Sequence, residues 1–308
     1  MFNYNHLYYF YITAKSGSTT VAASHLRISQ PSLSSQLGVL EDFLKVKLFR
    51  KVGRNNQLTE SGAIVYGYCR RMFDISEELS ELILEQHPTS VRKLSLGVSN
   101  EVKRSFAVDV VSAFMKKHGL TQRPKVTMIS GTHEQLVSRL RLREIDIMIS
   151  QFGMSDPELT SLMRTEVPVM LVASTKTKFY TKALNVKSAQ SIRDLFGNDL
   201  VQWVLPSASF KLRADIDRFI EHNEIKGRIV FESDVMDSLI RSVGDEIGVA
   251  FLPQLYVDKE IKGKQIRVLG PKEGFWKYRV WMGCHNQNRE DPLVVALAES
   301  FKRVCDNR

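Results

Sequence analysis

The side chains best suited to recognise another molecule by hydrogen bonding lie near the N-terminus of this 308-residue chain. Small hydroxyl and amide side chains crowd the start of an expected helix there: Ser29, Gln30, Pro31, Ser32, Ser35 and Gln36. Such groups hydrogen-bond base edges, and the exposed start of a recognition helix is the part that enters the major groove of DNA. A serine-rich helix start is also a good N-cap, so this segment alone leaves both interpretations open.

Three basic residues that follow favour nucleic acid. Arg50, Lys51 and Arg54 lie in and beside an expected turn between two short strands, where their charges can neutralise phosphates flanking the groove. Residues 1–58 hold seven basic against two acidic residues, whereas residues 59–86 hold two against six. The formal net charge of the whole chain is +9. Double-stranded DNA is therefore the predicted partner of the basic N-terminal head.

A second group of polar side chains follows the strands expected in the C-terminal part. Ligands of open α/β sheets bind beyond the carboxyl ends of the strands, which predicts an effector rim there. The predicted rim comprises Ser99, Asn100, Ser130, Thr132, Ser150 and Gln151, faced by Ser207, Phe231 and Phe251. Each Ser or Thr is equally well explained as a helix N-cap, and Thr132 suits that role. Glu101 and Glu134 are expected to be solvated residues of a first helical turn.

Nothing in the sequence indicates catalysis, a metal site or a cofactor. His6 and His133 have no paired carboxylate and nucleophile beside them, and the three cysteines are too scattered for a disulfide framework or a zinc site. We predict that the protein is not an enzyme. A small effector or a sodium ion is the expected ligand. For His133, a pH-sensing role is the alternative to a buried, hydrogen-bonded histidine.

Local patterns predict the elements that position these groups. Apolar periodicity indicates three short helices over 7–14, 21–26 and 33–44, followed by a small two-stranded wing. A longer helix begins at Thr59, and its apolar residues step by four and three, the heptad pattern of a helix that packs on a partner. These predicted dimerisation residues are Tyr68, Met72, Ile75, Leu79 and Leu82. The alternative is a surface helix that packs on its own chain.

After Pro88 the pattern changes to alternating strands and helices, typical of a parallel α/β sheet. One lobe has expected strands at 94–98, 125–129 and 145–149. A second has strands at 167–173, 203–205, 229–231 and 247–251, with helices near 209–222 and 234–243. Residues 278–284 and a final helix from Pro292 are expected to return to the first lobe.

The predicted fold is therefore multidomain: an N-terminal all-α winged helix-turn-helix with a linker helix, and a C-terminal two-lobe α/β domain. The predicted boundaries are 1–62 for the DNA-binding domain, 59–87 for the linker and dimerisation helix, and 91–308 for the effector-binding domain. Within the last, lobe I spans about 91–165 and 270–308, and lobe II about 166–269.

Several motifs together resemble the LysR-type transcriptional regulators over essentially the whole chain. They are the segments 10–18, Ala22–Ala23, 29–34, Leu40–Glu41, Leu48–Phe49, Arg54 and 58–62. Segments 3–10, 132–134 and 145–150 further resemble the NhaR subgroup, activators of sodium/proton antiporter genes. Many family members have arginine where this chain has Ser35 and Lys51, so the operator sequence does not carry over.

The resemblance implies a C-terminal domain like the periplasmic binding proteins, with an inducer held between two lobes. It also implies a homodimer or homotetramer that activates transcription, with RNA polymerase as a further partner. The chain opens without an export signal and has no run of roughly 20 apolar residues, so a cytoplasmic protein without membrane contact is expected.

Two alternatives remain open. One is a regulator of a metabolic operon with an organic anion as inducer, for which Arg104, Lys211 or Arg213 would supply the counter-charge. The other is a solute-binding protein or enzyme with an appended helix-turn-helix, against which the missing export signal and the lack of catalytic motifs argue.

Overall fold

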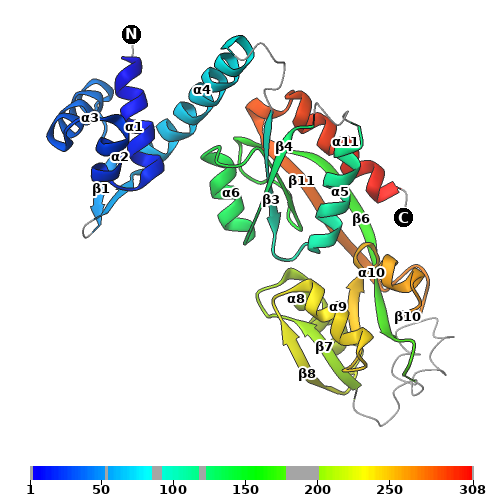
Figure 1. The fold of residues 1–308 in the computed structure, drawn as a ribbon. Coiled ribbons are helices and arrows are strands. Elements are labelled where there is room, and N and C mark those ends of the chain that lie inside the picture. The colour runs from blue at the N-terminus through cyan, green and yellow to red at the C-terminus, as the bar shows by residue number, and fades with distance from the viewer. Residues whose placement is uncertain (1–2, 53–54, 85–91, 118–122, 178–200, 307–308) are drawn as a thin grey trace. The chain divides into compact units, whose positions relative to one another are not determined.

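The computed structural model describes residues 3–52, 55–84, 92–117, 123–177 and 201–306 (Figure 1). The chain divides into two compact units. The first holds the residues up to Lys93 with the short pieces Leu120–Lys125 and Ser138–Glu144, and the second holds the remainder. Arg54 and the end of the predicted linker, residues 85–87, lie outside the described residues.

The first unit begins with three helices, α1 (Tyr4–Ser16), α2 (Thr19–Leu26) and α3 (Gln30–Leu44). The Ser18 and Ser29 side chains accept hydrogen bonds from the backbone N–H groups of Val21 and Ser32, which caps α2 and α3 as their sequences predict. The antiparallel wing consists of β1 (Phe49–Val52) and β2 (Asn55–Leu58), and α4 (Glu60–Leu84) follows it. The predicted winged helix-turn-helix is confirmed.

Helix α4 presents two different faces. Phe73 is buried, and its ring contacts those of Tyr4, Tyr8 and Tyr11 on α1 at centroid distances of 5.0–5.2 Å. The heptad residues lie elsewhere on the helix: Ile75 and Leu79 are 62% and 55% exposed. Tyr68 is also exposed and Met72 is half-buried, whereas the side chain of Leu82 lies outside the described part of the chain. Packing on the chain's own head therefore uses residues other than Ile75 and Leu79.

The second unit is built on a seven-stranded sheet. It contains β3 (Lys93–Ser99), β4 (Lys125–Gly131), β5 (Ile147–Ser150), β6 (Leu159–Ser174), β9 (Ala250–Pro253), β10 (Ile266–Leu269) and β11 (Trp276–His285). The strand order is β10-β6-β11-β5-β3-β4, and β9 pairs with β6. Strands β3 and β5 are parallel, but β6, β9, β10 and β11 pair antiparallel, so the sheet is mixed and the expected parallel sheet is wrong.

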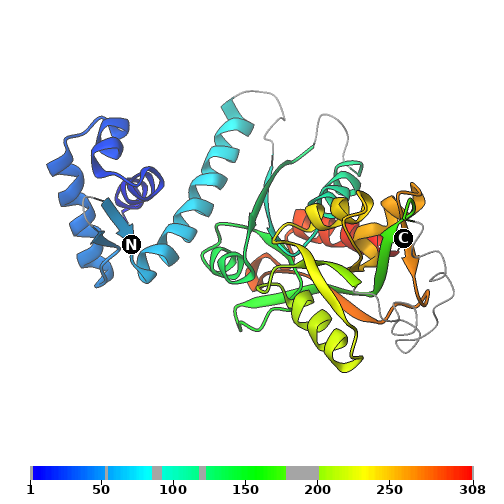
Figure 2. The ribbon, with the colours of Figure 1, turned by 90° about the horizontal axis from the view of Figure 1, so that it is seen from below.

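Lobe I is completed by helices α5 (Arg104–Met115), α6 (His133–Arg141) and α11 (Pro292–Asp306), and the short 3-10 helix η3 spans Asn286–Asn288. Helix α11 lies beside α5 in both views (Figures 1 and 2), with the rings of Phe106 and Phe301 at 5.7 Å. The C-terminal helix α11 therefore packs on α5. Strand β4 was expected to be buried, yet it lies at the sheet edge with most of its side chains exposed or half-buried.

Lobe II contains the parallel pair β7 (Val201–Pro206) and β8 (Gly227–Ser233) with helices α8 (Lys211–His222), α9 (Met236–Gly244) and α10 (Gln254–Lys262). Strands β6 and β11 run between the two lobes (Figure 1). The first half of β6 pairs with β11, and its last residues pair with β9 and β10. None of the described helices has the length and apolar composition that crossing a bilayer requires.

Candidate functional site

The start of α3 is the exposed part of the helix-turn-helix. Leu33, Leu37 and Leu40 face the core, whereas Ser29, Gln30, Pro31, Ser32 and Ser35 are exposed and Gln36 is half-buried. Ser29 is used as the cap, and Gln30 braces α3 against α2 through Thr19 and Thr20 at 3.4 and 3.3 Å. Ser32 and Ser35 are left on the outer side of the first turns. Capping and an outward-facing polar surface therefore coexist in this segment.

The wing is anchored by the carboxylate of Glu41, to which the sequence pattern assigns no structural role. Glu41 accepts hydrogen bonds from the backbone N–H groups of Leu48 and Phe49 at 2.8 and 3.3 Å, and from Lys47 Nζ at 2.7 Å. Burial opposes ionisation, but these donors outweigh it and lower the pKa of Glu41. Arg50 and Lys51 are exposed on β1, where the anchored wing holds their charges outward.

Three predicted rim residues come together in one buried cluster. The hydroxyls of Ser99 and Ser150 both donate to Gln151 Oε1, at 2.9 and 3.2 Å, and His133 Nδ1 lies 2.8 Å from Ser150 Oγ. Burial lowers the pKa of His133, which favours its neutral form near pH 7. The cluster lies at the carboxyl ends of β3 and β5, as strand-end reasoning predicts.

Glu101 connects this cluster to lobe II. It accepts a hydrogen bond from Gln151 Nε2 through one carboxylate oxygen, and from the Lys211 backbone N–H at 3.0 Å through the other. Its side chain is buried rather than solvated as expected, and that burial raises its pKa to about 7. A carboxyl group of lobe I thus holds the first residue of α8 in lobe II.

The remaining rim residues are separate from the cluster. Asn100, Ser130 and Thr132 are exposed, and Thr132 Oγ1 accepts from the Gln135 N–H at 3.3 Å, which bears out its N-cap alternative. Ser207 and Phe231 are half-buried in lobe II.

Phe251 is not at the rim. It is fully buried among the rings of Trp203, Phe219 and Trp276, because β9 pairs with β6 and turns this side chain into the core.

The cations proposed as counter-charges differ in their surroundings. Arg213 is engaged by Asp217 and Glu232, each at 2.8 Å, and Arg104 is exposed. The Lys211 ammonium lies 4.8 Å from the centre of the Phe152 ring.

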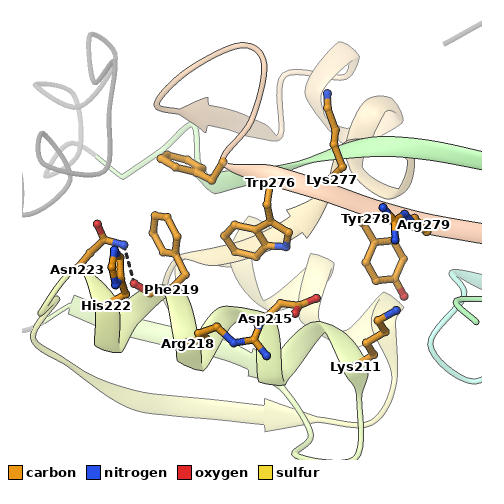
Figure 3. A pocket seen from close by; sticks show the side chains of 11 residues that line it. Lys211, Asp215, Arg218, Phe219, His222, Asn223, Trp276, Lys277, Tyr278 and Arg279 are labelled. Carbon is orange, nitrogen blue, oxygen red and sulfur yellow. Dashed lines mark hydrogen bonds and ion pairs between the residues drawn. The ribbon is translucent and has the colours of Figure 1, made fainter.

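A cavity of about 460 Å³ lies between α8 and β11 (Figure 3). Helix residues including Lys211, Asp215, Arg218 and Phe219 form one side, and Phe275 with residues 276–279 forms the other. The sequence analysis missed this cavity. Its sequence signal is the segment Trp276-Lys277-Tyr278-Arg279, whose alternation puts Trp276 and Tyr278 on one face of β11 and the two basic residues on the other.

The described residues hold no cluster suited to a metal ion, and two of the cysteines are buried. No three His, Cys, Asp or Glu side chains among them are placed to hold a metal. Burial raises the pKa of Cys69 to about 12 and that of Cys284 to about 11, so both remain unreactive thiols at neutral pH.

Comparison with known families accounts for most of the chain. Residues 4–63 match the model described as "Bacterial regulatory helix-turn-helix protein, lysR family", and residues 89–306 match "LysR substrate binding domain". These families, and the relatives below, are regulators and not enzymes, in agreement with the sequence prediction.

Individual relatives are distant. The transcriptional activator protein NhaR of Escherichia coli is 27% identical over 165 residues, which cover 54% of this chain and 54% of NhaR. The transcriptional activator AaeR of Escherichia coli is 28% identical over 261 residues, covering 83% of this chain and 79% of AaeR. Full-length OxyR from Pseudomonas aeruginosa shares the fold, with a TM-score of 0.67 and 17% identity over 98% of this chain and 95% of OxyR.

Proposed function

The chain belongs to the LysR family of transcriptional regulators, and we propose that it is a sequence-specific DNA-binding activator of a sodium/proton antiporter gene that responds to sodium or pH. It would act in the cytoplasm as a homodimer or homotetramer, with RNA polymerase and a small effector as further partners. The observation that carries DNA binding is the outward-facing start of α3 beside the basic wing.

The geometry of the head supports this role. A recognition helix reads base edges with its first turns, where Ser32 and Ser35 are exposed. Arg50 and Lys51 project from the wing, where phosphate contacts position a protein without reading the sequence. The Glu41 anchor keeps these two contact surfaces in a fixed arrangement within the head, because it ties α3 to the start of β1.

The antiporter assignment rests on the segments that resemble the NhaR subgroup and on the 27% identity to NhaR. In the structure, His133 from one of these segments hydrogen-bonds Ser150 from another, next to Glu101 with its raised pKa. Two titratable groups therefore belong to one hydrogen-bonded network, which supports a response to pH. The alternative is a regulator of a metabolic operon with an organic anion inducer.

Footprinting on the DNA between this gene and its neighbour tests both the specific DNA binding and the response to sodium. We expect a specific footprint that changes when potassium chloride is replaced by sodium chloride at equal ionic strength. An identical footprint in both salts would remove the sodium response and favour the alternative. Absence of any specific footprint would contradict regulation from that site.

Variants of the wing belong in the same experiment. Arg50→Ala and Lys51→Ala should each reduce the slope of log affinity against log salt by about 0.9, the value for one lost phosphate contact. Lys302→Ala, which removes an exposed charge from α11, is the matched control and should leave the slope unchanged.

The exposed heptad face of α4 supports dimerisation. Ile75→Glu should weaken the dimer by at least about tenfold, because a carboxylate in an apolar helix interface loses its hydration. Sedimentation equilibrium measures this change, with Ser155→Glu as a control that adds the same charge at an exposed site of the second unit. Unchanged dimerisation of the Ile75 variant would exclude this face as the interface.

A further inference from the structure

We propose that protonation of one buried carboxyl reverses the direction of the hydrogen bonds along four side chains: Glu101, Gln151, Ser150 and His133. The reversal would move the proton of the His133 ring from Nδ1 to Nε2. The inference rests on the proposed function, because it gives a response to pH a physical route through the candidate effector cluster. Each of the four side chains contacts the next, so they form a continuous relay.

The amide of Gln151 sets the direction of the relay while Glu101 is ionised. A carboxylate only accepts hydrogen bonds, and Gln151 Nε2 donates to Glu101 Oε1. The amide oxygen then lies on the opposite side, where it accepts from Ser99 Oγ and Ser150 Oγ at 2.9 and 3.2 Å. Gln151 and the two serines are at most 2% exposed, so the amide depends on these protein partners.

Ser150 carries this direction on to His133. Its single hydroxyl proton is directed at Gln151, so its oxygen can only accept from its other neighbours. These are the backbone N–H of Phe152 at 3.3 Å and His133 Nδ1 at 2.8 Å. The contact with His133 is therefore an N–H···O hydrogen bond, and the neutral ring carries its proton on Nδ1 and not on Nε2.

Protonation of Glu101 makes this arrangement incompatible. The backbone N–H of Lys211 is a donor in either state and meets Glu101 Oε2 at 3.0 Å, so the added proton lies on Oε1. The new O–H group and Gln151 Nε2 would then be two donors that face each other. Rotation of the Gln151 amide by half a turn removes the conflict, because its oxygen accepts from Glu101 and its NH2 group donates to the serine oxygens.

The reversal changes what the cluster offers to other groups. Ser150 now accepts from Gln151, so its hydroxyl proton can be donated to His133 Nδ1. The ring loses a proton to water at Nδ1 and gains one at Nε2, and the net uptake is the single proton on Glu101. Ser99 also becomes an acceptor towards the amide, and its own proton is released for another partner. The candidate effector cluster therefore presents different donors and acceptors in the two states.

Glu101 titrates near neutral pH because of its surroundings. Burial raises its pKa to about 7, against the opposing effects of the backbone N–H groups at the start of α8 and of the Lys211 charge. On α6, the nearby Glu134 raises this pKa further. Glu134 is exposed and its own pKa is lowered, so it stays ionised while Glu101 titrates.

The other groups around the relay keep their charge over the same range. Tyr256 on α10 and Tyr278 on β11 sense the charge of Glu101, and burial raises the pKa of both hydroxyls well above its ordinary value. Lys103 is paired with Glu260 at 2.6 Å. Burial lowers the pKa of His133, so its ring is neutral where the carboxyl takes up its proton.

Nitrogen-15 NMR of the histidine rings tests the relay, because the shift of each ring nitrogen reports whether it carries a proton. The full-length protein, labelled with 15N-histidine and sedimented, is measured at about pH 8.5 and about pH 6, on either side of the Glu101 pKa of about 7. The signals of His133 among the seven histidines are identified by their loss in His133→Gln. We expect a protonated Nδ1 at the higher pH and a protonated Nε2 with an unprotonated Nδ1 at the lower pH.

Two variants separate the relay from a general effect of charge. Glu101→Gln should hold His133 in the Nε2–H form at both pH values, because the new amide accepts from Lys211 and donates to Gln151 as the protonated carboxyl would. Glu134→Gln is the matched control. It removes a neighbouring charge outside the relay, so the exchange between the two forms should persist.

Three results would overturn the relay: the same His133 form at both pH values in the wild type, protonation of both ring nitrogens at the lower pH, or an Nδ1–H form in Glu101→Gln. The footprint on DNA separates this inference from the proposed function. A specific footprint without the exchange removes the relay alone. The exchange without a specific footprint contradicts the regulatory proposal alone.

Discussion

Replacing Glu101 by glutamine is expected to abolish a pH dependence of stability of about 3 kcal/mol between pH 4.5 and about 7. Burial raises the pKa of this carboxyl from 4.5 to about 7 in the folded protein. Within that window the folded chain keeps a proton that the unfolded chain has lost. The free energy of unfolding must therefore fall as the pH rises, and the wild-type protein is destabilised once Glu101 ionises. Glutamine has no titratable proton, so its contribution to the free energy of unfolding does not change with pH.

Urea unfolding followed by tryptophan fluorescence measures this difference, since all three tryptophans lie in the second unit. The quantity to compare at each pH is the free energy of unfolding of the wild type minus that of the variant. This difference cancels the titration of groups that the substitution leaves unperturbed. Glu273→Gln, at an exposed loop position, is the matched control and should track the wild type. Parallel curves for Glu101→Gln and wild type would show that the carboxyl is not protonated near neutrality, and would remove it as a pH-responsive link between the lobes.

Alanine at Gly62 should destabilise the DNA-binding head by about 2–3 kcal/mol, although glycine in a helix is ordinarily the less stable residue. A Cβ atom there would lie 2.0 Å from the carbonyl oxygen of Leu48. That oxygen accepts a hydrogen bond from the N–H of Thr59, the residue before α4. Leu48 itself is buried. The methyl group can be accommodated only if the junction between the wing and α4 opens.

Gly38 provides the matched control in the same head. It lies inside α3, and an added Cβ meets nothing within 4 Å, so Gly38→Ala should stabilise by about 0.4–1 kcal/mol. Thermal unfolding followed by circular dichroism compares the two variants. Equal shifts of the unfolding midpoint in the same direction would contradict the close packing of Gly62 against Leu48.

The head could be predicted because its signals are local. Ser18 and Ser29 cap their helices within three residues of themselves, and Pro31 occupies a first-turn position that needs no backbone donor. The role of Glu41 escaped notice because its partners lie seven and eight residues further along, beyond the range of helix periodicity.

The second unit could be predicted less well because its strands pair with strands that are distant in the sequence. Strand β6 runs through Pro168 for 16 residues and takes antiparallel partners from far along the chain, which no local pattern reveals. Helix α10 and β10 were missed in the same region. Phe251 was placed at the rim because strand-end reasoning identifies the end of a strand but not the face to which each side chain points. Glu101 was expected in solvent, yet the start of α8 covers it from a position 110 residues away.

The pairing of β11 between β5 and β6 also has a consequence for the order in which the protein is made. Helices α1, α2 and α3 and the wing can pack once α4 has been made, because their main contacts are with one another and with α4. The sheet of lobe I cannot be completed until residues 276–285 and α11, the last segments of the chain, have been synthesised. At translation rates of roughly 5–20 residues per second, the 111 residues between the end of β6 and the end of β11 take on the order of 5–20 s. Throughout this time, the facing edges of β5 and β6 lack their central strand, so the nascent second unit depends on protection from edge-to-edge association.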